Sequence, residues 1–379
     1  MAESRLGNPE RLSVDIGPVI DAEAKAGIEK HIQAMRDKGR NVYQVAIADS
    51  DEIKRGTYVM PTLIELESFD ELQREIFGPV LHVVRYKRKE LDQLIGQINA
   101  SGYGLTLGVH TRIDETIAKV IDSVNAGNMY VNRNIVGAVV GVQPFGGEGL
   151  SGTGPKAGGP LYLYRLLSTR PADAVQKSFA QGDAAIAPDT RLRETLLKPL
   201  NALKAWATSQ QLAALDAVIT QFTAQSQSGV TRLLAGPTGE RNSYSILPRE
   251  HVLCLAEDEA DLLTQLAAVL SVGSTAIIPD NELSKPLYKR LPKEVQARVK
   301  LVSDWTKDDI VIEAVLHHGD SDQLRGICEQ VAQRSGAIIG VHGLSKGETG
   351  IALERLVIER ALSVNTAAAG GNASLMTIG

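Results

Sequence analysis

The sequence has only two cysteines, the residue type best suited to act as a nucleophile at neutral pH. Cys254 lies in the apolar run HVLCLA, and Cys328 lies in GICEQVAQR, which has helical spacing. Neither has the basic neighbours that would favour the reactive thiolate, so we expect both to be buried and inert. Two cysteines 74 positions apart also exclude a framework of disulfides and a metal site built from four cysteines.

Histidines are the next residues that could do chemistry, and there are seven of them. None stands beside a carboxylate or a cysteine at the spacing that metal ligands require. The pair His317-His318 is the one cluster, but adjacent side chains diverge on a strand. We therefore expect a surface pair there, and the sequence predicts no metal site.

The segment Glu75-Ile-Phe-Gly-Pro-Val80 places a carboxylate and an aromatic ring just before a turn. A carboxylate can accept hydrogen bonds from two neighbouring ribose hydroxyls, and the ring of Phe77 could lie against a flat ligand. The alternative is a solvated Glu75 together with a Phe77 in the core. The residues alone favour the two interpretations equally, so both stay open at this point.

Residues 134–160 contain nine glycines in 27 positions, which predicts a loop whose backbone can approach another group closely. Backbone amides at Gly137 and Ala138 could form a concavity that binds an anion. The alternative is a hairpin of small residues without a ligand. Phe145, between Pro144 and a glycine pair, should project from a constrained part of this loop.

Residues 147–152 fit the pattern G-x-G-x-x-G of dinucleotide-binding loops literally. That pattern binds phosphate only where a strand precedes it and a helix opens on it. Pro155 and Pro160 follow here, so we expect no helix and no phosphate site.

The elements that position these residues follow from the apolar periodicity. Apolar spacing in the first half predicts helices over 21–38, 90–100 and 113–125 and strands over 41–47, 58–67, 80–86, 106–110 and 129–132. In the second half it predicts helices over 196–226, 257–270 and 321–335 and strands over 243–246, 251–255, 276–278, 310–316 and 337–341. Strands that alternate with helices predict an α/β protein with parallel pairing.

The domain organisation is suggested by a change in composition and by an internal repeat. Residues 170–195 are small and polar with weak periodicity, and we interpret them as a linker between domains 1–169 and 196–379. Gly108-Val-His110 precedes Val131-Asn132, and Gly340-Val-His342 precedes Val364-Asn365, with 22 and 23 positions from histidine to asparagine. This favours a degenerate duplication of one unit.

Composition excludes several functions. Apolar residues are 43% and charged residues 22%, and 40 basic against 45 acidic residues give a net charge of −5. No basic patch indicates binding to nucleic acid or to anionic lipid. No apolar run reaches the roughly 18 residues of a spanning helix, and MAESRLGNPE is not a signal peptide, so we expect a cytoplasmic location.

Seven short segments together resemble the aldehyde dehydrogenase family. They are Arg5-Leu-Gly-Asn-Pro9, Asp15-Ile-Gly-Pro-Val19, Gly56-Thr-Tyr-Val-Met-Pro-Thr-Leu63, Glu75-Ile-Phe-Gly-Pro79, Tyr103-Gly-Leu105, Gly127-Asn-Met-Tyr-Val-Asn132 and Pro144-Phe-Gly-Gly147. Residues 152–160 resemble the branch that oxidises L-glutamate γ-semialdehyde. The whole chain is similar to the C-terminal portion of long bifunctional enzymes of proline catabolism, which join an FAD-dependent proline dehydrogenase to an NAD-dependent 1-pyrroline-5-carboxylate dehydrogenase.

The resemblance implies roles for individual residues. Glu75 matches the family glutamate that accepts from the nicotinamide ribose of NAD, and Phe77 matches the aromatic residue beside the nicotinamide. Gly137 and Ala138 match the loop whose amides hold the carboxylate of the semialdehyde. Phe145 matches the aromatic residue that packs on the aliphatic chain of the substrate.

The resemblance also implies what this sequence does not carry. The family nucleophile is a cysteine before the Leu-Gly-Asn-Pro run, so we expect it upstream of Met1, together with the Gly-rich half of the NAD domain. We therefore expect no catalytic residue here, only part of the NAD site, and no activity from the chain alone. FAD, DNA-binding and membrane functions of the longer enzymes would reside elsewhere.

The expected fold is the C-terminal half of an aldehyde dehydrogenase catalytic domain, residues 1–169, followed by a second, degenerate α/β domain of the same kind, residues 196–379. In that second part Pro279 stands where the family has a cofactor-binding lysine, so we expect it to be non-catalytic. It would act as a lid or as the wall of a tunnel. A dimer is expected, with Tyr162–Ser168 at its interface. The alternative is a non-enzymatic lid or interaction module.

Overall fold

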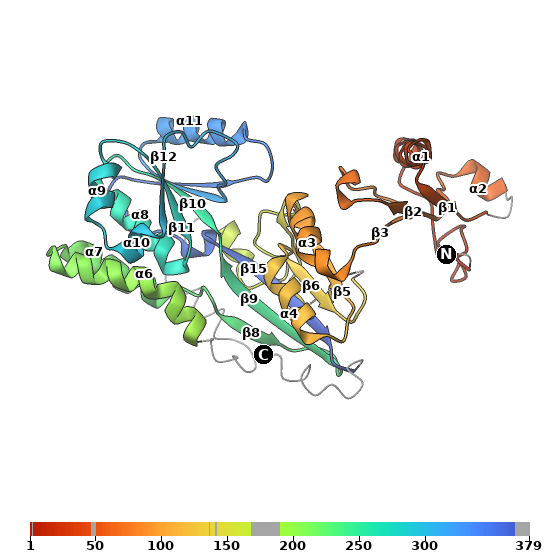
Figure 1. Cartoon of the computed structure of the whole chain (residues 1–379), viewed down its shortest axis with the longest axis horizontal. Helices are drawn as coiled ribbons and strands as arrows, with labels where there is room; N and C mark the ends of the chain where they lie inside the picture. Colours follow the sequence, from red (N-terminus) through yellow and green to blue (C-terminus); the bar gives the residue numbers. More distant parts are fainter. Residues whose placement is uncertain (2, 47–50, 136, 141, 168–189, 368–379) are drawn as a thin grey trace. The chain divides into compact units, whose positions relative to one another are not determined.

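The computed structural model describes residues 1, 3–46, 51–135, 137–140, 142–167 and 190–367. The chain divides into two compact units, Met1–Ser101 and Gly102–Gly379, and each is described here by itself. Figure 1 labels their helices and strands.

The first unit is built on a three-stranded sheet in the order β1-β2-β3. Strand β1 runs antiparallel to β2, and β2 runs parallel to β3. The elements are α1 (Ala22–Asp37), β1 (Asn41–Gln44), α2 (Asp51–Arg55), β2 (Thr62–Leu66), η1 (Phe69–Glu71), β3 (Val80–Val84), η2 (Arg88–Glu90) and α3 (Leu91–Ala100).

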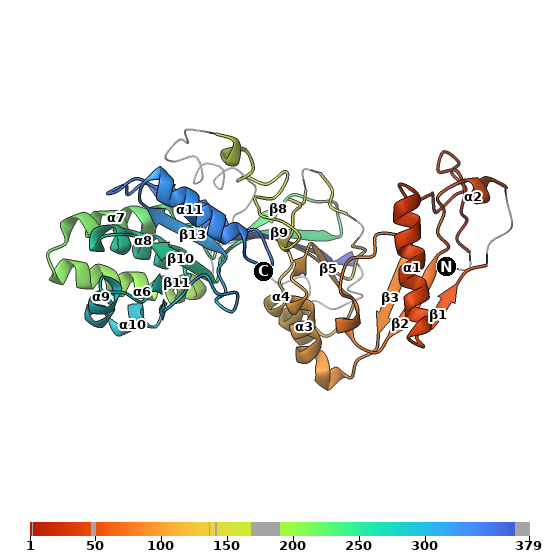
Figure 2. The same cartoon turned by 90° about the horizontal axis from the view of Figure 1, so that it is seen from above.

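Helix α1 covers this sheet, as Figure 2 shows. Asp21 caps its first turn by accepting from the amide of Ala24 at 2.7 Å. Ile28, Ile32 and Met35 follow at helical spacing and are buried. They pack with Ile64, which points inward because alternate residues of β2 face the helix. This small core holds the sheet and helix together.

The second unit contains two five-stranded sheets. Its elements before residue 168 are β4 (Tyr103–Gly104), β5 (Thr106–Val109), α4 (Asp114–Ser123), β6 (Asn128–Val131), β7 (Glu148–Gly149) and η3 (Leu163–Leu166). The later elements are α6 (Thr190–Ser209), α7 (Ala213–Gln225), β8 (Thr231–Leu234), β9 (Glu240–Pro248), β10 (His251–Leu255), α8 (Glu259–Val272), β11 (Thr275–Pro279), α9 (Ser284–Arg290), α10 (Lys293–Gln296), β12 (Val299–Val302), β13 (Ala314–His318), α11 (Ser321–Ala332), β14 (Gly340–Leu344), η4 (Leu353–Arg355) and β15 (Val357–Asn365).

The first of these sheets joins distant parts of the sequence in the order β5-β6-β15-β9-β8. Strand β15 pairs in parallel with β6, so that Val364 lies opposite Val131. These are the two valines of the internal repeat. On its other side β15 pairs antiparallel with β9 along nine residues. The strand from the end of the chain therefore completes the sheet that β5 and β6 begin.

The second sheet is entirely parallel and has the order β12-β11-β10-β13-β14. Alternate residues of its central strands face two different cores. Val252 and Cys254 of β10 pack with helices α6, α7 and α8, whereas Leu253 packs with Val331 of α11 on the opposite face. Figure 1 shows these helices on the two sides of the strands.

Helix α8 is buried almost all round, which explains its apolar sequence. It ends at Gly273, whose φ of 89° lies in the left-handed region. A Cβ at this glycine would approach Leu196 Cδ2 to 2.7 Å, so both the turn and the packing require glycine.

The predicted α/β class with parallel strands is confirmed, and most expected elements lie within a few residues of their predicted ends. The strand predicted over 310–316 begins later than expected, at Ala314. Strands β8, β12 and β15 had no counterpart in the expectations.

The compact units divide at Ser101, whereas the sequence suggests a linker at 170–195. Pairing of β6 with β15 places elements from both sides of that linker in one sheet. Helix α6 already begins at Thr190, and most of the expected linker lies outside the described residues. The predicted boundaries at 169 and 196 stay a prediction.

Two expectations about reactive side chains were wrong. His317 and His318 are buried, with 5% and 1% of their surface exposed, because β13 is a central strand covered on both faces. Cys328 is exposed on α11, whereas Cys254 is buried as expected. Within the described ranges, no helix is both long and apolar enough to cross a membrane.

Candidate functional site

The residues expected to bind cofactor and substrate fall in both units. Glu75 and Phe77 lie in the first unit, on the connection from η1 to β3. Gly137, Ala138 and Phe145 lie in the second unit, on the loop from β6 to β7.

The Glu75–Phe77 segment presents its outer side chains to solvent. Glu75 is exposed, and the ring of Phe77 is 83% exposed. Ile76 between them packs on the core under α1, so its neighbours on either side must point outward. A Cβ at Gly78 would lie 2.5 Å from Ile28 Cδ1, so the chain approaches α1 closely at this glycine. The structure therefore favours an accessible ring and carboxylate over a Phe77 in the core.

The approach to this segment is fixed by an ion pair. Ser68 and Glu71 form a capping box around η1. Arg40 Nε donates to Glu71 Oε2 at 2.8 Å. Burial is the largest single influence on the pKa of Glu71 and raises it, but the hydrogen bonds to Arg40 and to the backbone together lower the pKa below its usual value. The contact ties η1 to the residues that follow α1.

The loop that carries Gly137 and Ala138 is held at its base by Gln143. This side chain is buried, and its Nε2 donates to Asn242 Oδ1 at 3.0 Å and to Ser363 Oγ at 3.2 Å. Its Oε1 accepts from the amide of Val139 at 3.1 Å. Gln143 thus connects the tip of the loop to strands β9 and β15.

Arg133, just after β6, forms a second connection to the same strands. Its Nη1 donates to Ser363 Oγ at 2.8 Å and lies 2.9 Å from Glu240 Oε1. Its guanidinium carbon lies 5.0 Å from the centre of the Tyr130 ring, within the range of a cation–π contact. Both ends of the loop are therefore attached to β9 and β15.

The segment that carries Phe145 is fixed by its backbone. Phe145 exchanges two hydrogen bonds with Ala157, of 3.0 and 2.9 Å. Asn128 of β6 donates to the carbonyl of Pro144 at 3.0 Å and accepts from the amide of Gly146 at 3.1 Å. The main chain on both sides of Phe145 is therefore constrained, as the sequence predicts.

A buried lysine completes this support. Lys156 is 2% exposed, and its ammonium donates to Asn128 Oδ1 at 3.0 Å and to the carbonyl of Gly146. Desolvation lowers the pKa of Lys156 to about 8, which leaves the amine mostly protonated at neutral pH. Its own amide donates to Glu359 Oε2 at 2.7 Å, and Tyr244 donates to the other oxygen of Glu359 at 2.5 Å.

These supporting residues were missed in the sequence. Asn128 carried a signal, because it is a polar residue in the buried strand Asn-Met-Tyr-Val. Lys156 also carried one, as the one cation within a glycine-rich stretch. The partners of Arg133 and Gln143 on β9 and β15 carried none, since they lie between 97 and 230 positions away.

Other candidate sites are less well supported. Residues 147–152 form a turn that includes β7, which pairs with β4, and no helix opens on them among the described residues. In the described part of the chain, no three His, Cys, Asp or Glu side chains are placed to share a metal ion. Burial raises the pKa of the Cys254 thiol strongly, so this cysteine stays protonated.

The chain is similar to known proteins along its sequence. Residues 1–170 match the aldehyde dehydrogenase family. The bifunctional protein PutA of Salmonella typhimurium is 63% identical over 382 residues, which cover 100% of this chain and 29% of that protein. A 1-pyrroline-5-carboxylate dehydrogenase of Bacillus mycoides is 36% identical over 163 residues, which cover 42% of this chain and 30% of that protein.

A solved structure of Proline Utilization A (PutA) from Corynebacterium freiburgense resembles 96% of this chain and 33% of its own, with a TM-score of 0.59. Its sequence identity is 22%, so this likeness concerns the fold alone. The chain spans less than a third of the length of the PutA proteins that it matches. It is thus similar over its full length to a part of the bifunctional PutA proteins, and its residues 1–170 match the aldehyde dehydrogenase family model.

Proposed function

We propose that these residues form part of a bifunctional enzyme of proline catabolism. The site to which they contribute oxidises L-glutamate γ-semialdehyde, derived from 1-pyrroline-5-carboxylate, to L-glutamate with NAD⁺. Similarity to PutA over the whole chain and to a 1-pyrroline-5-carboxylate dehydrogenase over 163 residues supports this reaction. Proline oxidation with FAD would take place in another part of such an enzyme.

The attachment of the 134–147 loop to β9 and β15 is the observation that carries the proposal. A loop that binds a carboxylate through backbone amides must hold those amides in place before the ligand arrives. Gln143 does so through Val139 on one side and Asn242 on the other. A Cβ added at Gly137 would meet nothing within 4 Å, so a ligand has room there.

Glu75 and Phe77 would supply the cofactor contacts in this proposal. An exposed carboxylate beside an exposed aromatic ring suits a ribose and a nicotinamide. NAD⁺, when bound, accepts the hydride that leaves the aldehyde carbon. Phe145 would pack on the aliphatic chain of the semialdehyde.

In this proposal the chain contributes to the binding of substrate and cofactor but does not catalyse the oxidation of the aldehyde. Oxidation of an aldehyde in this family begins with attack by a thiolate on the carbonyl carbon and ends with hydrolysis of the thioester by water. Cys254 is buried and protonated, and Cys328 lies on α11, an element of the other sheet layer. We therefore propose that these 379 residues have no dehydrogenase activity on their own.

Residues 196–379 would have a supporting role. Glu240, Asn242 and Ser363 lie in this region, and all three contact Arg133 or Gln143. Through these contacts residues 196–379 can serve as a non-catalytic lid that braces the substrate loop. We also propose that the enzyme forms a dimer through residues 162–167, where Leu163 and Leu166 are 69% and 70% exposed.

The test uses a chimera in which these 379 residues replace the matching segment of the Salmonella PutA. We expect it to oxidise the semialdehyde. Changing Gln143→Ala should raise the KM for the semialdehyde about tenfold with little change in kcat. The loop would lose the hydrogen bonds that hold it in place, and ordering it on binding would cost about 1.4 kcal/mol of binding free energy. The KM for NAD⁺ should stay the same.

The control is Gln210→Ala, which removes an exposed glutamine beyond α6 and should leave both KM values unchanged. A Gln143→Ala enzyme with an unaltered KM for the semialdehyde would show that the loop does not bind substrate. A folded chimera without any dehydrogenase activity would contradict the proposed reaction itself.

A further inference from the structure

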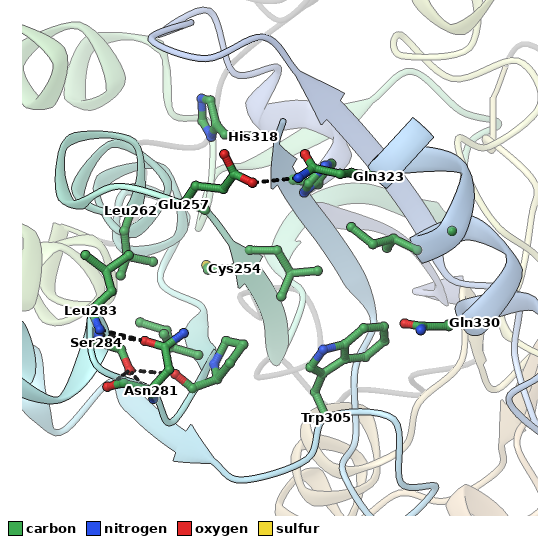
Figure 3. A pocket seen from close by; sticks show the side chains of 17 residues that line it. Cys254, Glu257, Leu262, Asn281, Leu283, Ser284, Trp305, His318, Gln323 and Gln330 are labelled. Atoms are coloured by element: carbon green, nitrogen blue, oxygen red, sulfur yellow. Dashed lines mark hydrogen bonds between the residues drawn. The ribbon is translucent and has the colours of Figure 1, made fainter. Parts of the chain in front are cut away.

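The parallel sheet of the second unit has a cavity that the proposed function does not use. In the order β12-β11-β10-β13-β14, the chain passes from β10 through β11 to β12 at one edge of the sheet. It then returns to β13, beside β10, and continues to β14 at the other edge, so the strand order reverses between β10 and β13. Ligands bind open α/β sheets at the carboxyl ends of the strands where the order reverses in this way. A cavity of about 420 Å³ lies there, lined by the ends of β10, β11 and β13 and by α11 (Figure 3). Its size suits a small organic molecule.

His317, at the end of β13, lines this cavity with two unsatisfied ring nitrogens. It is 5% exposed, and neither Nδ1 nor Nε2 has a hydrogen-bond partner among the described residues. Its neighbour His318 differs, because Gln265 lies 2.9 Å from its Nδ1 and the carbonyl of Glu348 lies 2.8 Å from its Nε2. A buried polar group without a partner costs about 1–3 kcal/mol, so a ligand that satisfies it gains affinity.

The ring of His317 is also fixed in place. A Cβ added at Gly319 would lie 2.5 Å from His317 Nε2, so the ring rests against this glycine. Burial lowers the pKa of His317, and the neighbouring His318 lowers it further, so the imidazole is neutral at neutral pH. A neutral imidazole has one donor and one acceptor.

The charges around the cavity disfavour phosphate. Of the described residues that line it, none is Lys or Arg, and Glu257 is the one charged side chain. The helices that begin nearby are capped by their own carboxylates. Asp258 accepts from an amide of α8 at 2.9 Å, and Asp320 accepts from two amides of α11 at 2.9 and 2.8 Å. These amides are the donors that a phosphate would otherwise use.

The remaining walls suit a flat ring with hydroxyl groups. Trp305 stands at the rim beside Gln330, and Cys254 lies at the base (Figure 3). Glu257 accepts from Gln323 at 2.6 Å on the opposite side. A carboxylate has about four acceptor sites, so this pair can also receive a hydroxyl.

We propose that this cavity binds an uncharged heteroaromatic molecule of nucleoside size and binds nucleotides that carry phosphate more weakly. The ring lies against Trp305 and bonds to His317, and a hydroxyl bonds to Glu257. The proposal is independent of the semialdehyde site.

The test is calorimetric titration of the 379-residue chain with adenosine, guanosine, cytidine and uridine, and with AMP and NAD⁺. At least one nucleoside should bind. AMP should bind at least fivefold more weakly than adenosine, and NAD⁺ should not bind in a manner that depends on His317. His317→Leu should weaken nucleoside binding at least tenfold, while His110→Leu, a change at an exposed histidine after β5, should not alter it. His317→Leu should also raise the midpoint of thermal unfolding without ligand, because it removes the unsatisfied nitrogens.

Tryptophan fluorescence gives a second measurement. The chain has two tryptophans, Trp206 and Trp305, so a Trp206→Phe variant reports on Trp305 alone. Stacking should quench this signal on addition of the nucleoside that binds. The absence of binding by all four nucleosides would show that the cavity holds solvent only and would overturn the proposal. Equal or tighter binding of AMP, or unchanged binding by His317→Leu, would overturn it as well. Tight binding of NAD⁺ would overturn it only if His317→Leu weakens that binding, because Glu75 and Phe77 are proposed to contact NAD⁺ elsewhere in the chain.

Discussion

Glu75 has the most specific role in the proposed binding of NAD⁺, because its carboxylate would accept hydrogen bonds from the ribose hydroxyls. Its carboxylate is exposed on a segment that Ile76 and Gly78 hold against α1. A charged acceptor of ribose hydroxyls is worth about 1.5–3 kcal/mol, roughly ten- to a hundredfold in binding. The side chain of Glu75 should therefore strengthen the binding of NAD⁺ and have little effect on the binding of the semialdehyde.

In the chimera, Glu75→Gln should raise the KM for NAD⁺ about tenfold, because the amide keeps an acceptor but loses the charge. The KM for the semialdehyde should change little. Steady-state kinetics with each substrate varied in turn measures both. Glu29→Gln, a change at an exposed glutamate of α1, is the matched control. Equal effects of the two substitutions would remove the cofactor role of Glu75.

His31 and His82 form a second test at the residue scale. Their Nε2 atoms lie 2.9 Å apart, so one ring must donate to the other and at least one must be neutral. Burial lowers the pKa of both, Arg74 and Lys38 lower that of His31 further, and His31 lowers that of His82 further. The folded-state pKa values thus lie below the unfolded value of 6.5.

This sign means that the pair's contribution to stability is present above pH 6.5 and is lost as the pH falls below it. The free energy of unfolding in urea should therefore decrease from pH 7.5 to 5.5. The double variant His31→Gln, His82→Gln should lose less over the same interval. A parallel decrease in both proteins would mean that the pair does not contribute.

The residues of the candidate site differ in how far the sequence reveals them. Glu75, Phe77 and Phe145 stand beside turn residues, so local pattern and family resemblance suffice to propose them. Gln143 could not be found, because its meaning depends on Asn242 and Ser363, which only strand pairing brings near. His317 was misjudged for a related reason, since burial of β13 follows from its central place in the sheet.

At the scale of elements, α8 should carry much of the stability of the second unit. Leu266 in this helix is fully buried among α6, α7 and the parallel sheet. Leu266→Ala should lower the free energy of unfolding by about 2–5 kcal/mol, the usual cost of such a cavity. Urea denaturation followed by circular dichroism measures this. Ile338→Ala, at a side chain that is 80% exposed, should change the free energy by less than about 0.5 kcal/mol.

The elements themselves follow from the sequence wherever the signal is local. Helix α1 has an aspartate cap and a regular apolar face, and β10 is a continuous apolar run. Strand β15 was missed because its pattern reads Val-Ile-Glu-Arg-Ala-Leu, with charges in the middle. Glu359 is buried there by its contacts with Lys156 and Tyr244, which are more than a hundred positions away.

At the scale of the whole molecule, we propose that the chain supplies a loop that binds substrate but supplies no catalytic nucleophile. Phe145 and its loop are supported by β6, β9 and β15, whereas Cys254 is buried and Cys328 lies on α11. We therefore propose that these residues bind the semialdehyde and NAD⁺, and that the covalent steps take place in another part of the enzyme.

The most direct test of this assignment compares the 379-residue chain with the chimera in one assay, the formation of NADH from the semialdehyde and NAD⁺. The chain alone should form none above the rate without protein, and the chimera should turn over. Turnover by the chain alone would contradict the assignment, because it would require a nucleophile among these residues.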